Sequence, residues 1–331
     1  MNQFLSLEDV EDLWILIEKV KYFKKNPYSF QKMGENKAIG LVFFNPSLRT
    51  RLSSQKAAFN LGANIWILNA DNDSWKIEIN DGTVMETSQE HIKEAIYVMS
   101  LYCDILAVRT FPKFLDRYYD SQELFFKKIK NYSRVPVVSL ESATLHPLQS
   151  LADVITIEEF RPPKKKRIKV VLSWAPHVRV LPHSVPNSFL QWVSQLSEVD
   201  LVITHPKEYE LDKRFSQMAK ITYDQKEAFE GADFIYAKNW SSYLSYGKIL
   251  SQDPNWRITK EKMSLTNNGK FMHCLPVRRG IVVEDSVLDG KNSLVFQQAE
   301  NRMFSTQTVF IEILKKILSD SFNKNRRKYY R

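Results

Sequence analysis

Residues 38–51 read Ala-Ile-Gly-Leu-Val-Phe-Phe-Asn-Pro-Ser-Leu-Arg-Thr-Arg, and this stretch decides how the first part of the chain folds. Its apolar first half is typical of a buried strand, and the pattern from Thr50 onward predicts a helix closed by Gly62. The join would direct helix N-terminal N–H groups, the Arg49 guanidinium and the Ser47 hydroxyl at one point. The stretch therefore predicts an anion site, although a capped helix with solvated arginines would leave the same pattern.

The composition is that of a globular chain. Its 331 residues, 44% of them hydrophobic, are enough for two domains with separate cores. No apolar run is long enough to span a membrane and the acidic N-terminus does not resemble a signal peptide, so we expect a cytoplasmic protein without a membrane partner. The two cysteines, Cys103 and Cys274, allow neither a disulfide framework nor a cysteine-rich zinc site.

The net charge of +9 indicates an anionic partner, which could be a nucleic acid or a small molecule. Much of the excess lies in the basic runs at 164–167 and 324–331, which are typical of a solvated linker and a terminus. Neither run is accompanied by a nucleic-acid recognition motif. We therefore expect a small anionic substrate and no nucleic acid, and the sequence indicates no role for either run.

Strand-like runs alternate with helical patterns along the chain, which predicts an α/β fold of two domains, each a parallel sheet flanked by helices. The predicted strands lie at residues 38–44, 64–68, 104–109, 135–140, 167–174, 199–205, 233–238, 270–275 and 293–296. Besides the helix after Thr50, we predict helices at residues 7–21 behind Ser6, 89–102 behind Ser88, 146–160 and 301–318.

The domain boundaries follow from this alternation. We predict a first domain at 1–150 and a second at 151–300, with the Pro-Pro-Lys-Lys-Lys stretch as the clearest break in the sequence. A C-terminal helix at about 301–320 packs back on the first domain, and a basic tail follows at 321–331.

Polar clusters follow the predicted strands where these end. In open parallel sheets, ligands bind beyond the carboxyl ends of the strands, so we expect an active site in a cleft between the two domains. The clusters are Ser47 to Arg51, Arg109, Glu141 with His146 to Gln149, Lys238, and His273 to Arg279.

These side chains suit a phosphate group next to a carbonyl. Arg49 and nearby hydroxyls could hold the phosphate, and Arg109 could bridge phosphate and carbonyl. His146 could donate to a carbonyl oxygen on which negative charge develops, and Gln149 could bind a carbamoyl amide. A helix-start histidine bonded to nearby backbone is the simpler alternative for His146.

The motifs Ser47-Leu48-Arg49-Thr50-Arg51, Arg109, His146-Pro147-Leu148-Gln149 and His273-Cys274-Leu275-Pro276 resemble those of the aspartate and ornithine carbamoyltransferases, over essentially the whole chain. The resemblance implies transfer of a carbamoyl group from carbamoyl phosphate to an amine, without metal or cofactor, in a homotrimer whose Trp75 reaches a neighbouring subunit's site. It implies that Arg109, His146 and Thr50 are catalytic. The implied carbamoyl phosphate ligands are Ser47, Leu48, Arg49, Thr50, Trp75, Arg109, His146, Pro147, Leu148, Gln149, Cys274, Leu275 and Arg302.

Within the ornithine branch the chain resembles the acylornithine enzymes of arginine biosynthesis, because the Ser-Met-Gly element of the free-ornithine enzymes is missing. The resemblance implies that the acylornithine contacts are Glu141, His177, Lys238, Cys274, Leu275 and Arg278. Acetyl enzymes carry a modified lysine where Val282 stands, which favours N-succinyl-L-ornithine as acceptor. The residue that selects the acyl group matches Gln89, which is neither the acetyl-type glutamate nor the succinyl-type proline. N-acetyl-L-ornithine, free L-ornithine, and an inactive or basic binding relative stay open as alternatives.

Overall fold

The computed structural model of the chain describes residues 1–70 and 72–329, with residues 321–329 described by their backbone alone. The side chains of the predicted basic tail, 321–331, therefore lie outside the described part. The chain divides into two compact units. Unit 1 comprises Met1–Phe111, Ser121–Ser142 and Met303–Arg331, and unit 2 comprises Pro112–Asp120 and Ala143–Arg302.

Unit 1 contains a four-stranded parallel sheet, as the sequence predicted. In the order β2-β1-β5-β6, its strands are β2 (Asn64–Asn69), β1 (Ala38–Phe43), β5 (Ile105–Arg109) and β6 (Val137–Glu141). Along the chain, at least one helix lies between each pair of consecutive strands of this sheet, so each connection between parallel strands is a crossover. The first strand of the chain, β1, lies inside the sheet and is buried over residues 39–43.

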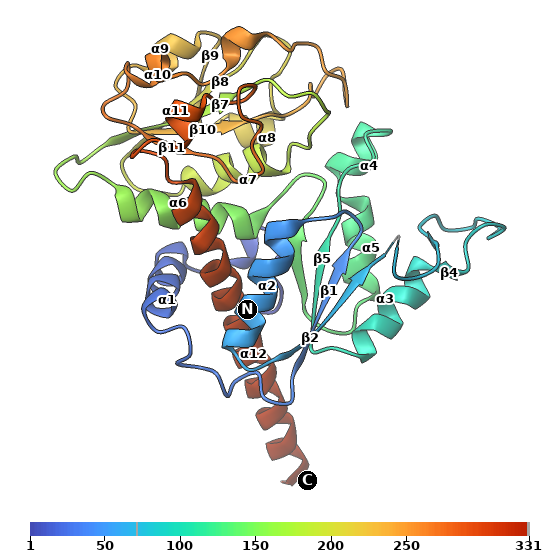
Figure 1. The fold of residues 1–331 in the computed structure, drawn as a ribbon. Coiled ribbons are helices and arrows are strands. Elements are labelled where there is room, and N and C mark those ends of the chain that lie inside the picture. The colour runs from blue at the N-terminus through green and yellow to red at the C-terminus, as the bar shows by residue number, and fades with distance from the viewer. Residues whose placement is uncertain (71, 330–331) are drawn as a thin grey trace. The chain divides into compact units, whose positions relative to one another are not determined.

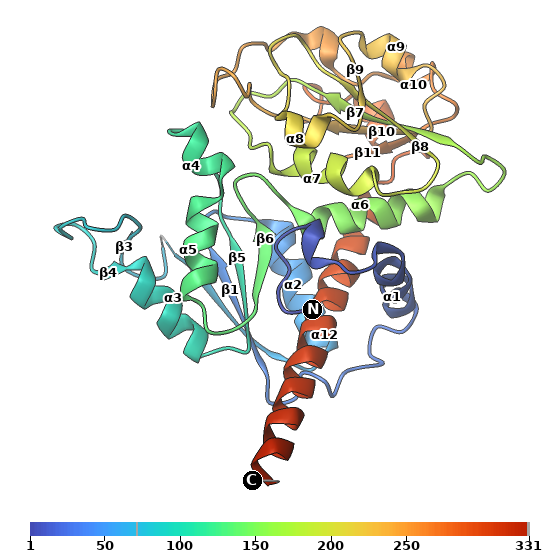
Figure 2. The same cartoon turned by 180° about the vertical axis from the view of Figure 1, so that it is seen from behind.

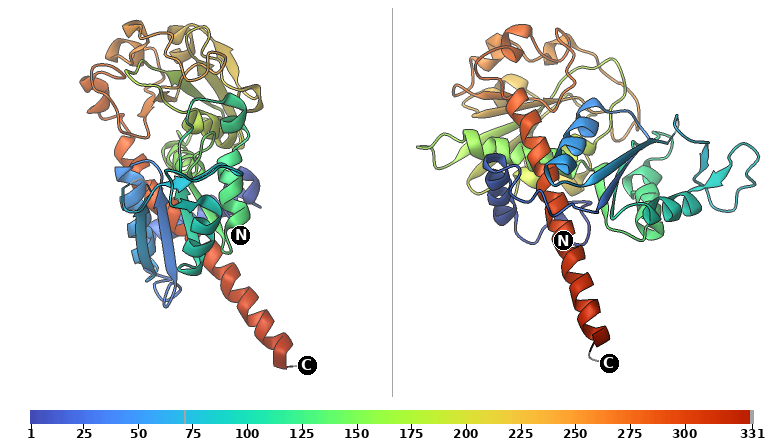
Figure 3. Two further views of the ribbon diagram at one scale, coloured as in Figure 1. Left: turned by 90° about the vertical axis from the view of Figure 1, so that its right-hand side faces the viewer. Right: turned by 60° about the horizontal axis from the view of Figure 1, so that its bottom comes forward.

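Helices cover both faces of this sheet (Figure 1). On one face, α3 (Ile92–Leu101) and α5 (Leu124–Tyr132) insert Ile92, Ile96, Phe126 and Ile129 into a cluster with sheet residues. On the other face, α2 (Leu48–Asn60) lies beside α12 (Val295–Tyr329), where the buried Asn60 amide donates to Gln307 Oε1 at 2.8 Å. Figure 3 shows α12 as one uninterrupted helix.

Unit 2 contains a five-stranded parallel sheet in the order β11-β10-β7-β8-β9. Its strands are β11 (Lys270–Met272), β10 (Phe234–Lys238), β7 (Ile168–Trp174), β8 (Val199–Thr204) and β9 (Lys220–Thr222). Two helices, α6 (Pro147–Phe160) and α7 (Ser184–Val193), run along one face (Figure 2). The other face is covered by α9 (Gln225–Phe229), α10 (Lys260–Met263) and α11 (Asp285–Leu288).

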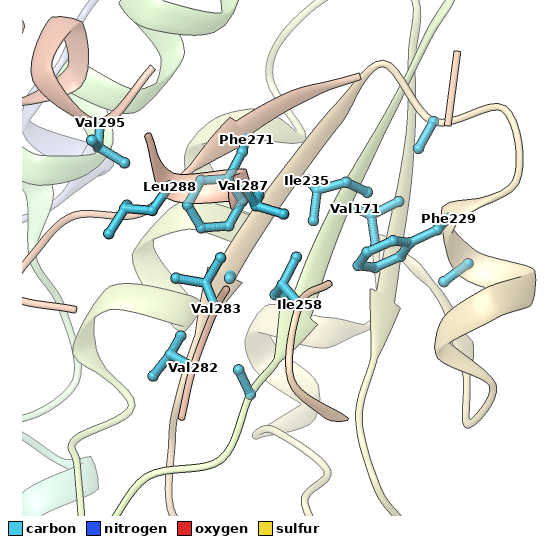
Figure 4. Packing of buried hydrophobic residues seen from close by; sticks show 14 of the residues in the cluster. Val171, Phe229, Ile235, Ile258, Phe271, Val282, Val283, Val287, Leu288 and Val295 are labelled. Carbon is cyan, nitrogen blue, oxygen red and sulfur yellow. The ribbon is translucent and has the colours of Figure 1, made fainter. Parts of the chain in front are cut away.

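The core on that second face is apolar. Figure 4 shows Val171, Ile235 and Phe271 of three neighbouring strands packed against Phe229 of α9 and Leu288 of α11. Because side chains of a strand alternate between faces, Tyr236 of β10 points to the opposite face, where its ring packs at a tilt against Phe189 of α7 with centroids 4.3 Å apart. The sheet of unit 2 therefore separates an apolar face from the face that carries polar groups of α6.

The remaining elements are η1 (Leu7–Asp9), α1 (Leu13–Lys25), β3 (Ile77–Glu78), β4 (Glu90–His91), α4 (Arg117–Ser121), α8 (Lys213–Ser216) and η2 (Pro254–Trp256). Within the described residues, no helix is long and apolar enough to cross a membrane.

Two predicted helices start later than expected. The prediction of a helix at 7–21 behind Ser6 is wrong in its first turns, because only η1 forms there and α1 starts behind Asp12, whose carboxylate accepts from Ile15 N at 3.0 Å. The helix predicted at 89–102 starts at Ile92, since Glu90 and His91 pair as β4 with β3.

The predicted strand at 293–296 is wrong. Ser293 makes only an isolated bridge with Phe271, and Val295 already begins α12. The units divide after Ser142 and not after residue 150, so that α6 belongs to unit 2. Its polar groups bond to the first turns of α12, and such contacts between distant segments leave no periodic signal in the sequence.

Candidate functional site

In unit 1, three strands that lie side by side deliver polar residues at their carboxyl ends. Arg109 is the last residue of β5 and aligns with Phe43 of β1. The register between β5 and β6 shifts between Val108 and Arg109, so that Arg109 aligns with Glu141. The chain order β1, β5, β6 thus brings residues from positions about 40, 109 and 141 to one edge of the sheet, as the strand-end argument predicted.

The turn after β1 forms a capped helix start. Ser47 is the N-cap of α2, and its hydroxyl accepts from Thr50 N at 3.2 Å. The first turn of α2 therefore presents backbone N–H groups and the positive end of the helix dipole. Arg51 Nη1 bonds to Asn69 Oδ1 of β2 at 3.4 Å, which gives this arginine a structural partner.

Arg109 is held from several sides. Its Nη1 donates to Thr50 Oγ1 at 3.0 Å and lies 3.0 Å from Glu141 Oε2, and its guanidinium lies over the Phe111 ring at 4.6 Å. Thr50, Arg109 and Glu141 are all buried. We call Ser47, Arg49, Thr50, Arg109 and Glu141 the Arg109 cluster. Within it Arg49 is half-buried, whereas the neighbouring Leu48 side chain is 67% exposed.

In unit 2, the head of α6 meets the start of α12. His146 is the N-cap and Pro147 the first helical residue, a position that suits proline. Arg302 Nη1 donates to Gln149 Oε1 at 3.0 Å, and Arg302 Nη2 lies 2.9 Å from His146 Nε2. All three side chains are buried, as is Leu148. We call His146, Gln149 and Arg302 the Arg302 cluster.

The contact with Arg302 assigns the tautomer of His146. A guanidinium can only donate hydrogen bonds, so Nε2 must accept and the proton of the neutral ring lies on Nδ1. The donor that His146 offers to a carbonyl oxygen is therefore Nδ1–H. The sequence predicted a histidine donor but could not say which nitrogen carries the proton.

Two buried residues that the sequence reasoning missed support this cluster. Asp153 Oδ1 accepts from Gln149 Nε2 at 2.8 Å and from Gln298 Nε2 at 2.6 Å. Burial raises the pKa of the Asp153 carboxyl to about 7, against hydrogen bonds that act in the opposite direction. The available signal was an acidic residue one helical turn after Gln149 in an otherwise apolar helix.

The loop after β11 carries the His-Cys-Leu-Pro motif. His273 N donates to Gln298 Oε1 at 3.0 Å, and Leu275 N donates to His273 Nδ1 at 2.9 Å. The half-buried Cys274 interacts with the Tyr236 hydroxyl. His273 is thus a structural member of the motif, while Cys274 and Leu275 occupy the turn that it supports.

Cations gather around His177 in the loop after β7. Arg278 Nε bonds to His177 Nε2 at 3.2 Å, and Lys238 ends the neighbouring strand β10. Burial, and then the charges of Lys238, Arg278 and Arg179, lower the pKa of the His177 imidazole. No ion pair links these three cations to a carboxylate within the described residues. The sequence prediction included His177, Lys238 and Arg278 but missed Arg179, whose signal was its place two residues after His177.

Trp75, predicted to act across a subunit boundary, and Gln89, predicted to select the acyl group, lie together in unit 1. Trp75 is 56% exposed, and its Nε1 donates to Glu90 Oε2 at 2.7 Å. The parallel pairing of β3 with β4 holds exposed Gln89 beside this pair, with Gln89 N bonded to Lys76 O at 3.2 Å. Glu90, which the prediction did not include, therefore orients the Trp75 indole.

Both parts of the chain match family models. Residues 2–159 match the aspartate/ornithine carbamoyltransferase carbamoyl-P binding domain, and residues 182–313 match the corresponding Asp/Orn binding domain. Within the described residues, no group of three or more histidine, cysteine, aspartate or glutamate side chains could hold a metal ion.

Individual relatives match over nearly the whole chain. An N-succinylornithine carbamoyltransferase of Bacteroides thetaiotaomicron is 47% identical, covering 95% of this chain and 99% of that protein. An N-acetylornithine carbamoyltransferase of Xylella fastidiosa is 37% identical, covering 92% and 96%. Among solved structures, a mutant N-acetyl-L-ornithine transcarbamylase complexed with carbamyl phosphate and N-succinyl-L-norvaline superimposes with a TM-score of 0.88 at 34% identity, covering 95% of this chain and 100% of that chain.

Proposed function

Because the chain belongs to the aspartate/ornithine carbamoyltransferase family, we propose that it transfers the carbamoyl group of carbamoyl phosphate to the δ-amine of N-succinyl-L-ornithine, giving N-succinyl-L-citrulline and phosphate in arginine biosynthesis. The choice of acceptor rests on sequence identity over nearly the whole chain. This identity is 47% to an N-succinylornithine enzyme and 37% to an N-acetylornithine enzyme.

The proposed donor site draws on both clusters. The α2 N-terminus, Ser47 and Arg49 suit the phosphate group, because backbone N–H groups and a guanidinium provide several donors to a dianion. In the other cluster, Arg302 adds a second guanidinium and Gln149 Oε1 an acceptor for the carbamoyl amide. The further proposed donor contacts are Leu48, Thr50, Trp75, Arg109, His146, Pro147, Leu148, Cys274 and Leu275.

The proposed reaction is a direct attack. The uncharged δ-amine adds to the carbonyl carbon, and the developing oxyanion is stabilised by Arg109, Thr50 and the Nδ1–H of His146. The bond between the carbonyl carbon and the bridging phosphate oxygen then breaks, phosphate leaves with the bonding electrons, and the extra proton of the amine nitrogen passes to the departing phosphate. Positioning and electrostatics account for this chemistry without a covalent enzyme intermediate.

The cations around His177 support an acceptor with negative charge. An N-acylated ornithine has no α-ammonium, so its carboxylate charge is not balanced within that part of the molecule, and a succinyl group adds a second carboxylate. Lys238, Arg278 and Arg179 offer positive charge for these groups. Glu141, Cys274 and Leu275 are further proposed acceptor contacts.

Two positions bear on the choice between succinyl and acetyl. Val282 is buried in the unit 2 core (Figure 4), so it is a packing residue and cannot carry the modification of a lysine. Gln89 is exposed and neutral, and it could donate a hydrogen bond to a succinyl carboxylate where a glutamate would repel it.

The experiment is a comparison of acceptors. Purified protein is given carbamoyl phosphate with N-succinyl-, N-acetyl- or free L-ornithine, and the ureido product and phosphate are measured together. We expect kcat/KM to be highest with the succinyl compound. A higher value with N-acetyl-L-ornithine would establish the second candidate, which is favoured by the likeness to acetylornithine enzymes of known structure.

We also propose a cytoplasmic homotrimer in which Trp75 contributes to a neighbouring subunit's site. A complementation experiment tests this arrangement. W75A and R49A proteins, each inactive, are mixed and allowed to exchange subunits. If Trp75 serves a neighbour, some mixed assemblies contain an intact site and activity returns to a fraction of the wild-type value. Activity that stays absent despite subunit exchange would place Trp75 in its own subunit's site.

A further inference from the structure

A buried chain of polar side chains connects three motifs that lie far apart in the sequence of unit 2. Gln149 of α6 and Gln298 of α12 both donate to Asp153 Oδ1, at 2.8 and 2.6 Å. On its other side, Gln298 accepts from His273 N at 3.0 Å. This hydrogen-bonded network thus extends from the His-Pro-Leu-Gln helix through the start of α12 to the His-Cys-Leu-Pro loop.

The acceptor in the middle determines how both amides point. A carboxylate oxygen can only accept, so Gln149 and Gln298 must each turn their NH₂ group toward Asp153. Their oxygens then face away, Gln149 Oε1 toward Arg302 and Gln298 Oε1 toward His273 N. Without an acceptor at position 153, the Gln149 amide could rotate by half a turn and present its NH₂ group to the Arg302 guanidinium, a contact between two donors.

The surroundings leave little freedom for rearrangement. Gln149, Asp153 and Gln298 are 1%, 0% and 0% exposed, so water does not replace a lost partner without a change of structure. Tyr236 of β10 is also fully buried, which raises the pKa of its hydroxyl, and the Asp153 carboxyl and Cys274 lie close enough to raise it further, although that hydroxyl forms no hydrogen bond to either. Its side chain therefore lies between the network and the turn of the His-Cys-Leu-Pro loop.

We propose that Asp153 and Gln298 are positioning residues for carbamoyl transfer, which orient the Gln149 amide oxygen and Arg302 and hold the backbone at Cys274 and Leu275 in register with them. Neither residue needs to touch a substrate. The inference rests on the proposed function, since it assigns a task to residues that support the proposed donor site.

The test compares variants that differ in hydrogen-bonding capacity but little in shape. D153L and Q298M remove the donors or acceptors, and we expect kcat/KM for carbamoyl phosphate to fall about 10- to 100-fold, because small misplacements of reacting groups have effects of that size. D153N is the conservative variant. Its Oδ1 can still accept from both glutamines and its NH₂ can donate to the Tyr236 hydroxyl, so we expect it to stay within about threefold of wild type.

A matched control removes a similar buried bond elsewhere between the same two helices. Asn301 Nδ2 of α12 donates to Thr156 Oγ1 of α6 at 3.0 Å, one turn beyond Asp153. T156V should lower thermal stability as Q298M does while leaving kcat/KM within about twofold. The proposal would be overturned if Q298M, at equal thermal stability, had the same kcat/KM as T156V. It would also be overturned if kcat/KM fell as far in D153N as in D153L.

A second variant keeps the proposal testable if Q298M does not fold. Q298E retains an oxygen for His273 N but places a carboxyl against Asp153, and two such groups hold their hydrogen bond only while they share a proton. Its activity relative to wild type should therefore fall as the pH rises from 6 to 8; a constant ratio would contradict the proposal. If the wild-type protein transferred carbamoyl groups to none of the ornithine compounds, the proposed function would be refuted. That result differs from every outcome of the variant tests.

Discussion

Arg109 and Glu141 are the last residues of neighbouring strands, and their side chains form a buried ion pair with Nη1 and Oε2 3.0 Å apart. A carboxylate next to a proposed oxyanion ligand weakens the attraction for an anion, but it fixes the guanidinium where Thr50 Oγ1 also accepts from it. The ion pair thus lowers the positive potential at Arg109 and fixes the orientation of its guanidinium.

We expect E141Q to lower the free energy of unfolding by about 3 kcal/mol, because the change removes one charge of a buried pair. The measurement is urea denaturation, with and without carbamoyl phosphate, which should restore part of the loss by supplying an anion to Arg109. The matched control is E198Q, which affects the exposed pair with Arg167 and should change stability by less than about 0.5 kcal/mol. Equal effects of the two substitutions would show that burial of the Arg109 pair has no energetic consequence.

The Ser47 cap should have two separable effects. S47A removes the acceptor for Thr50 N and should destabilise the protein by about 1 kcal/mol. D12A removes the same kind of cap from α1, where Asp12 accepts from Ile15 N, and should cost a similar amount. Only S47A should also raise KM for carbamoyl phosphate, by about tenfold, in steady-state assays. A similar KM increase in D12A would mean that the effect comes through stability.

Removing a cation near His177 should affect the acceptor and not the donor. K238M is expected to raise KM for N-succinyl-L-ornithine by about 10- to 100-fold, the effect of one lost charge-assisted hydrogen bond, with little change in KM for carbamoyl phosphate. K220M, which removes an exposed lysine paired with Glu227 at 3.2 Å, is the control and should change neither constant. An unchanged acceptor KM in K238M would remove Lys238 from the proposed site.

The raised pKa of Asp153 makes a prediction about stability and pH. The carboxyl titrates at about 7 in the folded chain and near its ordinary value of 3.8 when unfolded, so the folded state binds the proton more tightly. Its contribution is fully present below about pH 4 and is lost as the pH rises through 7. Asp153 faces two other ionisable groups, Tyr236 and Arg302. Burial raises the pKa of the Tyr236 hydroxyl well above its ordinary value, so this group stays protonated over the range.

The free energy of unfolding of the wild type, measured relative to D153N, should therefore fall between pH 4 and pH 8, by on the order of 2–4 kcal/mol. Asparagine does not titrate, so other groups cancel in the difference. Denaturant titrations at four pH values would suffice. Parallel stability curves would show that Asp153 has the same affinity for protons in both states.

Much of the fold was predictable because its signals are local. The strands β1, β2, β5, β6, β7, β8 and β10 were predicted within two residues at each end from apolar runs. The errors arose where tertiary pairing competed with local pattern, as at Glu90 and His91, whose helical pattern yields to pairing with β3. The apolar residues at 293–296 similarly suit a strand or a helix, and only their packing selects α12.

The sequence by itself determined the strand–turn–helix at Ser47, the cap of α2, the alternation of strands and helices and the motifs that indicate carbamoyl phosphate, since each depends on residues within a few positions of one another. Only the tertiary structure decided that Arg109 pairs with Glu141, that Arg302 binds the acceptor nitrogen of His146, and that Gln298 reaches Asp153 from 145 positions away. The physical reason is that a buried polar group is satisfied by whichever partner the packed chain brings within 3 Å, and sequence distance does not constrain that choice.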